Sequence, residues 1–223
     1  MKFNEDLFSW LEAPFSDLGF KKAIYFEHNG LFDFEKESED SIQWIRMAFD
    51  ITKKGFVRLD GYIQFKPVVD VLEKFVTIKE EFKEEIVGNY PLYKQKQLWI
   101  SECQRLSNLP LNSSSDLDNF KIKIFSHIRD FILPFFDEYH SLQAVNDKII
   151  NEVQQNEYSN FIPGKTNFKV LIILRMAQNP KYEEFRDWAL KAYQKGVELD
   201  AATYQKEYDT LVRLTNYLDK EGF

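Results

Sequence analysis

The sequence predicts a soluble α+β protein with an N-terminal helix, an antiparallel sheet of four to five strands and a helical C-terminal half. Three observations carry this prediction. Apolar residues recur every fourth position near the N-terminus, two aromatic segments are each divided by a glycine-containing turn, and the second half keeps helical spacing. With 44% hydrophobic residues, the 223-residue chain has enough apolar area to form a core.

The first expected helix lies close to the N-terminus, where Phe3, Leu7 and Leu11 form an apolar stripe. Pro14 lacks a backbone donor and Gly19 favours a left-handed conformation, so we expect these two residues to end the helix. The β region then follows.

The first aromatic segment predicts a hairpin whose register depends on its loop. A two-residue turn ending at Gly30 would pair apolar residues with acidic ones and mix the faces of the sheet. A three-residue loop ending there pairs Phe26 with Phe32 and Ile24 with Phe34, with the glycine at the left-handed bulge position. We therefore expect the three-residue loop.

The second aromatic segment predicts a matching hairpin. A three-residue loop ending at Gly55 pairs Phe49 with Leu59 and Met47 with Gly61, and it again places glycine in a left-handed conformation. A further pair would join Ile51 to Val57, so that Val57 faces the core. Two such hairpins predict an antiparallel sheet with one face more apolar than the other.

Pro67 cannot donate to a strand ladder, and helical spacing follows it, so we expect a helix there and another strand at Gln97 to Glu102. The polar loop at 112–115 suggests a division into a helix-plus-sheet region, 1–111, and a helical region, 112–223, packed as one unit with the first. Five helical segments are expected in the second region, and Pro134 should end or kink one of them.

The charge and cysteine content exclude several classes of function. A net charge of −7 argues against nucleic-acid binding, which depends on clustered basic residues. No apolar run is long enough for a membrane span, and the acidic N-terminus does not resemble an export signal. The single cysteine, Cys103, cannot form an intramolecular disulfide, which favours the reducing cytoplasm.

No motif indicates a cofactor, a metal site or a catalytic residue. Gly164-Lys165-Thr166 resembles the end of a phosphate-binding loop, but the glycine that should precede it by five residues is Ser159. The three histidines, His28, His127 and His140, are not at metal-ligand spacing. We expect His127 to be a partly buried structural residue.

One candidate binding surface emerges from strand alternation. It places Trp44 and Arg46 on one strand beside Arg58, Tyr62 and Gln64 on the next, on the face opposite the apolar core. Tryptophan, tyrosine and arginine dominate binding hot spots. Two interpretations remain open: helices from the C-terminal half cover this face, or it binds a ligand or partner.

Two segments carry a family resemblance. Leu18-Gly19-Phe20-Lys21-Lys22 followed by Tyr25-Phe26, and later the stretch Leu133 to Tyr139, resemble an uncharacterised bacterial domain-of-unknown-function family. The resemblance spans most of the chain and implies the same order of helix, hairpins and helical half. That family implies no established activity, so it assigns no catalytic residue.

These observations favour a non-enzymatic cytoplasmic protein of the binding or regulatory kind, such as an immunity-type or partner-binding factor. Its partner would be another protein or a small ligand, and the oligomeric state stays open. The alternative is a hydrolase whose carboxylates come together only in the fold.

Overall fold

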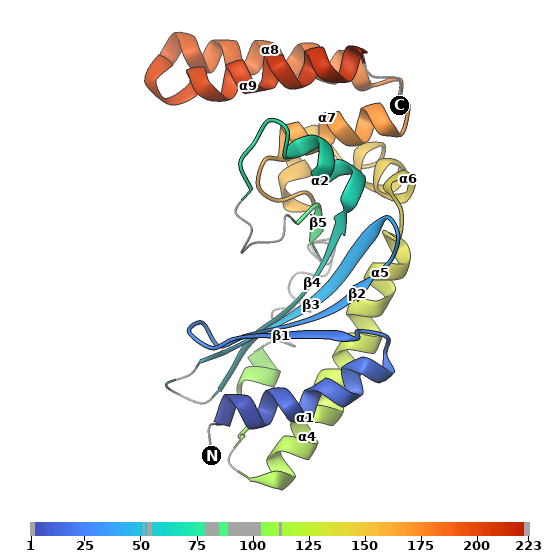
Figure 1. Ribbon diagram of the computed structural model, residues 1–223, viewed down its shortest axis with the longest axis vertical. Coiled ribbons are helices and arrows are strands. Elements are labelled where there is room, and N and C mark those ends of the chain that lie inside the picture. The colour runs from blue at the N-terminus through green and yellow to red at the C-terminus, as the bar shows by residue number, and fades with distance from the viewer. Residues whose placement is uncertain are drawn as a thin grey trace. The chain divides into compact units, whose positions relative to one another are not determined.

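The computed structural model of the protein describes residues 3–50, 52, 55–78, 85–88, 104–111 and 113–220 (Figure 1). It confirms the α+β class, with an N-terminal helix, a five-stranded antiparallel sheet in the order β1-β2-β3-β4-β5 and a helical C-terminal half. The strands are β1 (Lys22–Phe26), β2 (Leu31–Glu37), β3 (Ser41–Asp50), β4 (Gly55–Phe65) and β5 (Val87–Gly88).

Helices precede the sheet and follow it. Before it lies α1 (Phe3–Asp17), and α2 (Lys66–Leu72) follows β4, with Pro67 in its first turn as expected. The strand expected at Gln97 to Glu102 lies outside the described residues. The later helical segments are α4 (Ser114–His127), η2 (Ile128–Ile132), α5 (Leu133–Glu138), α6 (Leu142–Val145), η3 (Asn146–Ile150), η4 (Gln155–Asn160), α7 (Thr166–Met176), α8 (Tyr182–Leu199) and α9 (Ala201–Lys220).

The chain forms two compact units, each made of two stretches of sequence. One combines Met1–Ile63 with Val87–Tyr139, and the other combines Gln64–Ile86 with His140–Phe223. This division differs from a boundary at 111/112, because α4 packs on the sheet: the Phe120 ring lies 5.5 Å from that of Phe56. The polar loop before α4 is a helix start rather than a linker, since Ser113 forms a capping box with Asp116.

Helix α1 continues through Pro14 and ends only at Asp17, so the prediction that Pro14 helps to end it is wrong. A proline near the end of a helix removes only one intrahelical hydrogen bond, and Phe15, one residue later, is fully buried in the core. Gly19 does terminate the helix, with φ +91°, and the Phe20 N–H donates to the Phe15 carbonyl in a Schellman arrangement.

The first hairpin has a different register from the expected one. Phe26 pairs with Leu31 and Tyr25 with Phe32, so the loop holds four residues, 27–30, instead of three. Contact with α1 accounts for the difference, because this register brings Tyr25 within 5.7 Å of the Phe8 ring. Gly30 is left-handed, with φ +62°, and this part of the prediction is confirmed.

The second hairpin also departs from expectation. Gly55 opens β4 and its φ lies outside the left-handed region. Val57 is 50% exposed, whereas Phe56 is buried against Phe49, so the regular alternation of β4 is interrupted between residues 56 and 59. The expected pairing of Ile51 lies outside the described residues.

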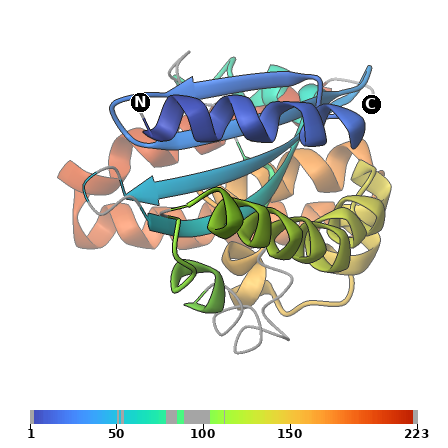
Figure 2. The same ribbon diagram turned by 90° about the horizontal axis from the view of Figure 1, so that it is seen from below.

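Helices α1 and α4 cover the same, apolar face of the sheet (Figures 1 and 2). Phe15 of α1 stacks on Phe34 of β2 at 3.8 Å and contacts Phe125 of α4 at 5.0 Å. Gly61 of β4 lets η2 approach closely, because a Cβ there would lie 2.9 Å from Ile132 Cγ2. Buried residues of this core include Phe32, Phe34, Ile45, Met47, Phe49, Leu59 and Ile63.

In the second unit, α7 is buried from Phe168 to Leu174, as its largely apolar sequence predicts, and the buried stretch includes Lys169. Helices α8 and α9 lie side by side (Figure 1), and Asp200 between them caps α9 by accepting from the Thr203 N–H at 3.2 Å. Gly196 lies inside α8, whose last residue is followed by Asp200. Across the described residues, no helix is both long and apolar enough to cross a membrane.

Candidate functional site

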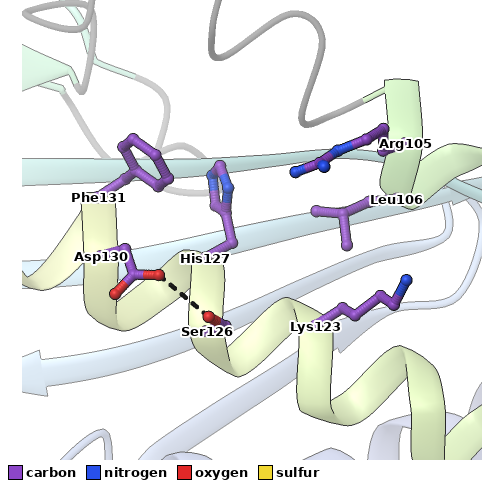
Figure 3. Close-up of a pocket in the computed structure, with 7 residues that line it drawn as sticks. All are labelled: Arg105, Leu106, Lys123, Ser126, His127, Asp130 and Phe131. Carbon is purple, nitrogen blue, oxygen red and sulfur yellow. Dashed lines mark hydrogen bonds between the residues drawn. The ribbon is translucent and has the colours of Figure 1, made fainter.

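Two groups of polar residues lie within the unit that contains the sheet. The first, which we call the sheet-face cluster, occupies the face opposite the apolar core and comprises Asp33, Glu35, Trp44, Arg46, Arg58, Asp60 and Tyr62. The second, the His127 pocket, is lined by Arg105, Leu106, Lys123, Ser126, His127, Asp130 and Phe131 (Figure 3).

The sheet-face cluster contains four residues of the predicted binding surface, Trp44, Arg46, Arg58 and Tyr62. The rings of Trp44 and Tyr62 lie 5.3 Å apart, and the Arg46 guanidinium carbon lies 5.9 Å from the Tyr62 ring centroid. Alternation therefore placed these residues on one face correctly. Gln64 belongs to the other compact unit.

The tryptophan of that surface is not exposed. Trp44 is fully buried, so it cannot serve as an exposed contact residue of a binding surface. Arg46 already has a partner within the protein, because its Nε and Nη2 donate to the two oxygens of buried Asp33 at 2.8 and 2.7 Å. Only Arg58 extends into solvent, with its side chain 51% exposed.

Each buried carboxylate of the cluster forms an ion pair with a basic side chain. Besides the Asp33–Arg46 pair, Glu35 lies 3.2 Å from Lys22. Asp60 lies 2.5 Å from Arg58, but burial dominates over this attraction and raises the pKa of the Asp60 carboxyl. Matched charges of this kind are typical of a structural network.

The His127 pocket is built on one stripe of a continuous helical rod. Lys123, Ser126, His127, Asp130 and Phe131 stand at relative positions 0, 3, 4, 7 and 8, which place them on one side of a helix. The buried stripe that packs in the core, Phe120, Ile124, Ile128 and Ile132, lies on the adjacent side of the same rod. A helical turn at 104–107 adds Arg105 and Leu106 from elsewhere in the chain.

A π-helical turn, η2, interrupts this rod at the pocket. The Leu133 N–H donates to the carbonyl of Ile128, five residues back, instead of the usual four. Pro134 explains the widened turn, because it has no N–H and its ring would clash with the carbonyl of Asp130. The turn contains Asp130 and Phe131, so the expected kink at Pro134 shapes the pocket itself.

His127 is the central group of the pocket. Its side chain is 4% exposed, and neither ring nitrogen has a hydrogen-bond partner among the described residues. Burial lowers the pKa of His127 to about 4, against a smaller opposing effect of Asp130. At neutral pH the imidazole is therefore uncharged and offers one donor and one acceptor.

The pocket has a volume of about 430 Å³ and carries opposite charges at its two ends. Figure 3 shows Arg105 and Lys123 on one side of His127, and Asp130 with Phe131 on the other. The Ser126 hydroxyl donates to Asp130 Oδ2 at 3.0 Å. The Phe131 ring lies 4.8 Å from the imidazole and covers part of it.

This arrangement does not resemble a nucleophilic triad. In such a triad the histidine lies between the nucleophile and the carboxylate, whereas here Ser126 bonds directly to Asp130. Among the residues that the structure describes, no group of three or more His, Cys, Asp or Glu side chains could hold a metal ion. His28 and His140 are exposed, and Cys103 lies outside the described residues.

No family model matches this chain, and no curated protein and no solved structure matches it significantly. The resemblance to an uncharacterised bacterial family therefore stays a prediction. The sequence-based search also missed this pocket, although the helical stripe around His127 was visible in the spacing. Arg105 could not be assigned to it, because only the fold brings residues 104–107 to that helix.

Proposed function

We propose that the chain is a non-enzymatic binding protein that holds a small molecule in the His127 pocket. One observation carries this proposal: a buried imidazole with two unpartnered nitrogens within the described part of the chain. A buried polar group without a partner costs about 1–3 kcal/mol, and a ligand that supplies the missing hydrogen bonds recovers this energy. The volume of about 430 Å³ also falls in the usual range for small-molecule sites.

The same observations favour binding over catalysis at this site. The Ser126 hydroxyl donates to Asp130 and not to the imidazole of His127, so the serine, histidine and aspartate are not in the order that activates a nucleophilic serine. A neutral histidine next to two cations is well suited to orient a ligand. The single cysteine supports a cytoplasmic location for such a protein.

The hydrolase alternative rests on a different residue, Asp60. Its burial raises the pKa of the carboxyl, as in a general acid. However, Arg58 is paired with this carboxylate at 2.5 Å, and Asp33 is held by Arg46 in the same cluster. A catalytic pair needs two carboxylates that face a substrate, so the binding function has the stronger support.

The proposal can be tested by following the imidazole signals of the ¹⁵N-labelled full chain by NMR. Small carboxylic acids, amines, amides, phosphates and dipeptides would be added up to about 1 mM, a range that detects Kd values of that order. We expect at least one of these classes to shift the His127 signals saturably, because a ligand supplies partners to its nitrogens.

The exposed His28 and His140 serve as internal controls, and a His127→Phe variant assigns the signals. Shifts confined to His28 and His140, or no saturable shift with any compound class, would contradict the proposed function.

A further inference from the structure

The charges that line the His127 pocket are separated along its length. Arg105 and Lys123 lie at one end, Asp130 lies at the other, and the imidazole stands between them (Figure 3). Lys123 and Asp130 are seven helical positions apart, which corresponds to about 10 Å along the helix axis. A molecule that spans the pocket therefore meets cations, then a neutral ring, then a carboxylate.

Each of these groups selects a chemical partner. A guanidinium carries five N–H donors in a fixed fork and suits a carboxylate. Asp130 suits an ammonium group, and the hydrogen bond from Ser126 at 3.0 Å orients its carboxylate. The neutral imidazole of His127 has one donor and one acceptor, which match the carbonyl and N–H of an amide.

We infer that the ligand is a zwitterion whose carboxylate and ammonium groups are several bonds apart, as in a dipeptide or an ω-amino acid. This inference rests on the proposed function and assigns the ligand class to the same site. An extended dipeptide spans about 7 Å. The side chains of Lys123 and Asp130 reach towards it and make up the rest of the roughly 10 Å between these two residues. An α-amino acid has adjacent charges and cannot reach both ends. Buried Leu106 and half-buried Phe131 provide apolar contacts for a ligand side chain.

The first test compares ligands by calorimetry and by the His127 NMR signals, using the full chain. Glycyl-leucine should bind at least about tenfold more tightly than N-acetyl-glycyl-leucine, glycyl-leucinamide or free leucine, because each of these lacks one charge or the required separation. A further probe, 6-aminohexanoate, distinguishes the two kinds of zwitterion, the dipeptide and the ω-amino acid. Binding equal to that of glycyl-leucine points to an ω-amino acid, and weaker binding points to a peptide whose amide contacts His127.

The second test uses variants at the two ends. Asp130→Asn should weaken glycyl-leucine by roughly ten- to a hundredfold while leaving the acetylated peptide unaffected, because only the free peptide carries an ammonium group. Arg105→Gln should weaken both peptides but leave glycyl-leucinamide unaffected. Both positions are exposed, so the variants are expected to fold. The matched controls Asp118→Asn and Arg129→Gln change exposed residues that do not line the pocket and should leave all affinities unchanged.

Equal affinities for the free and acetylated peptides, or unchanged binding by Asp130→Asn, would overturn the inferred orientation and ligand class. The outcomes also distinguish a failure of the inferred ligand class from a failure of the proposed binding function. If zwitterions leave the His127 signals unchanged while another compound class shifts them, the zwitterion is refuted and the binding function stands. If no compound shifts these signals, both are refuted.

Discussion

The sheet-face cluster and the His127 pocket lie in the same compact unit but differ in how their buried ionisable groups are paired. In the cluster, Asp33 at 2% exposure receives two hydrogen bonds from Arg46, and the other buried carboxylates also meet basic side chains. In the pocket, His127 is buried to a similar degree, yet its nitrogens have no partner within the described residues.

The comparison teaches that burial alone does not identify a site. A buried charge that is matched inside the protein stabilises the fold only while its partner is present. A buried polar group that is unmatched adds a cost in the free protein that a ligand can remove. Arg46, one of the residues predicted from hot-spot composition, belongs to the first kind.

The largest expected effect is the loss of Arg46. Arg46→Met should lower the free energy of unfolding by about 3–5 kcal/mol, because it leaves the Asp33 carboxylate buried and uncompensated. Urea denaturation at pH 7 measures this change. The double variant Arg46→Met/Asp33→Leu should recover most of the loss, and the control Arg129→Met, at an exposed position, should change stability by less than about 0.5 kcal/mol. A loss below about 1 kcal/mol for Arg46→Met would mean that the cluster does not contribute as a matched network.

The next effect concerns pH. The folded protein holds the pKa of His127 at about 4, below its ordinary value of 6.5, so between these pH values the unfolded chain binds a proton that the folded protein does not. The contribution of the neutral imidazole is therefore present above pH 6.5 and is lost as the pH falls towards 4. This loss amounts to about 3 kcal/mol over the whole window.

Comparison with His127→Phe isolates this residue, because acidic groups elsewhere titrate in both proteins. The wild-type free energy of unfolding should fall more steeply than that of the variant between pH 6.5 and pH 4. At pH 7 the variant should be as stable as the wild type or more stable by about 1 kcal/mol, since it removes two unpartnered nitrogens. Parallel pH profiles would show that the imidazole is not buried in its neutral form.

The smallest effect is expected at Asp60. Its carboxylate is paired with Arg58, like the other carboxylates of the sheet-face cluster, but burial disfavours its charged form. Its pKa is raised above 3.8, so its favourable contribution exists below that pH and is lost as the pH rises through the folded-state value. Asp60→Asn at pH 7 should leave stability unchanged or raise it by up to about 1 kcal/mol, since the exposed Arg58 gains little from the pair. Thermal unfolding at pH 7 measures it, and a loss above about 2 kcal/mol would place Asp60 with Asp33 among the matched charges.

Several predictions that depend on local sequence were correct, although those for Pro14 and Gly55 were not. The α+β class, a helix with Pro67 in its first turn and the left-handed Gly30 follow from backbone preferences and side-chain periodicity. The sharing of one sheet face by Trp44, Arg46 and Tyr62 also follows, because alternation is a property of the strand itself.

Other features were decided only by tertiary structure. The register of the first hairpin depends on Phe8 of α1, which packs against Tyr25 from a different part of the chain. Trp44 is buried although strand alternation placed it on the polar face.

The candidate site shows the same difference between features set by local sequence and features set by tertiary structure. Residue types and helical spacing by themselves determined that Lys123, His127 and Asp130 share one side of a helix, since this geometry repeats with the helical turn. Tertiary structure decided that His127 is buried and that Arg105 joins it, because burial and long-range proximity depend on which distant elements pack together.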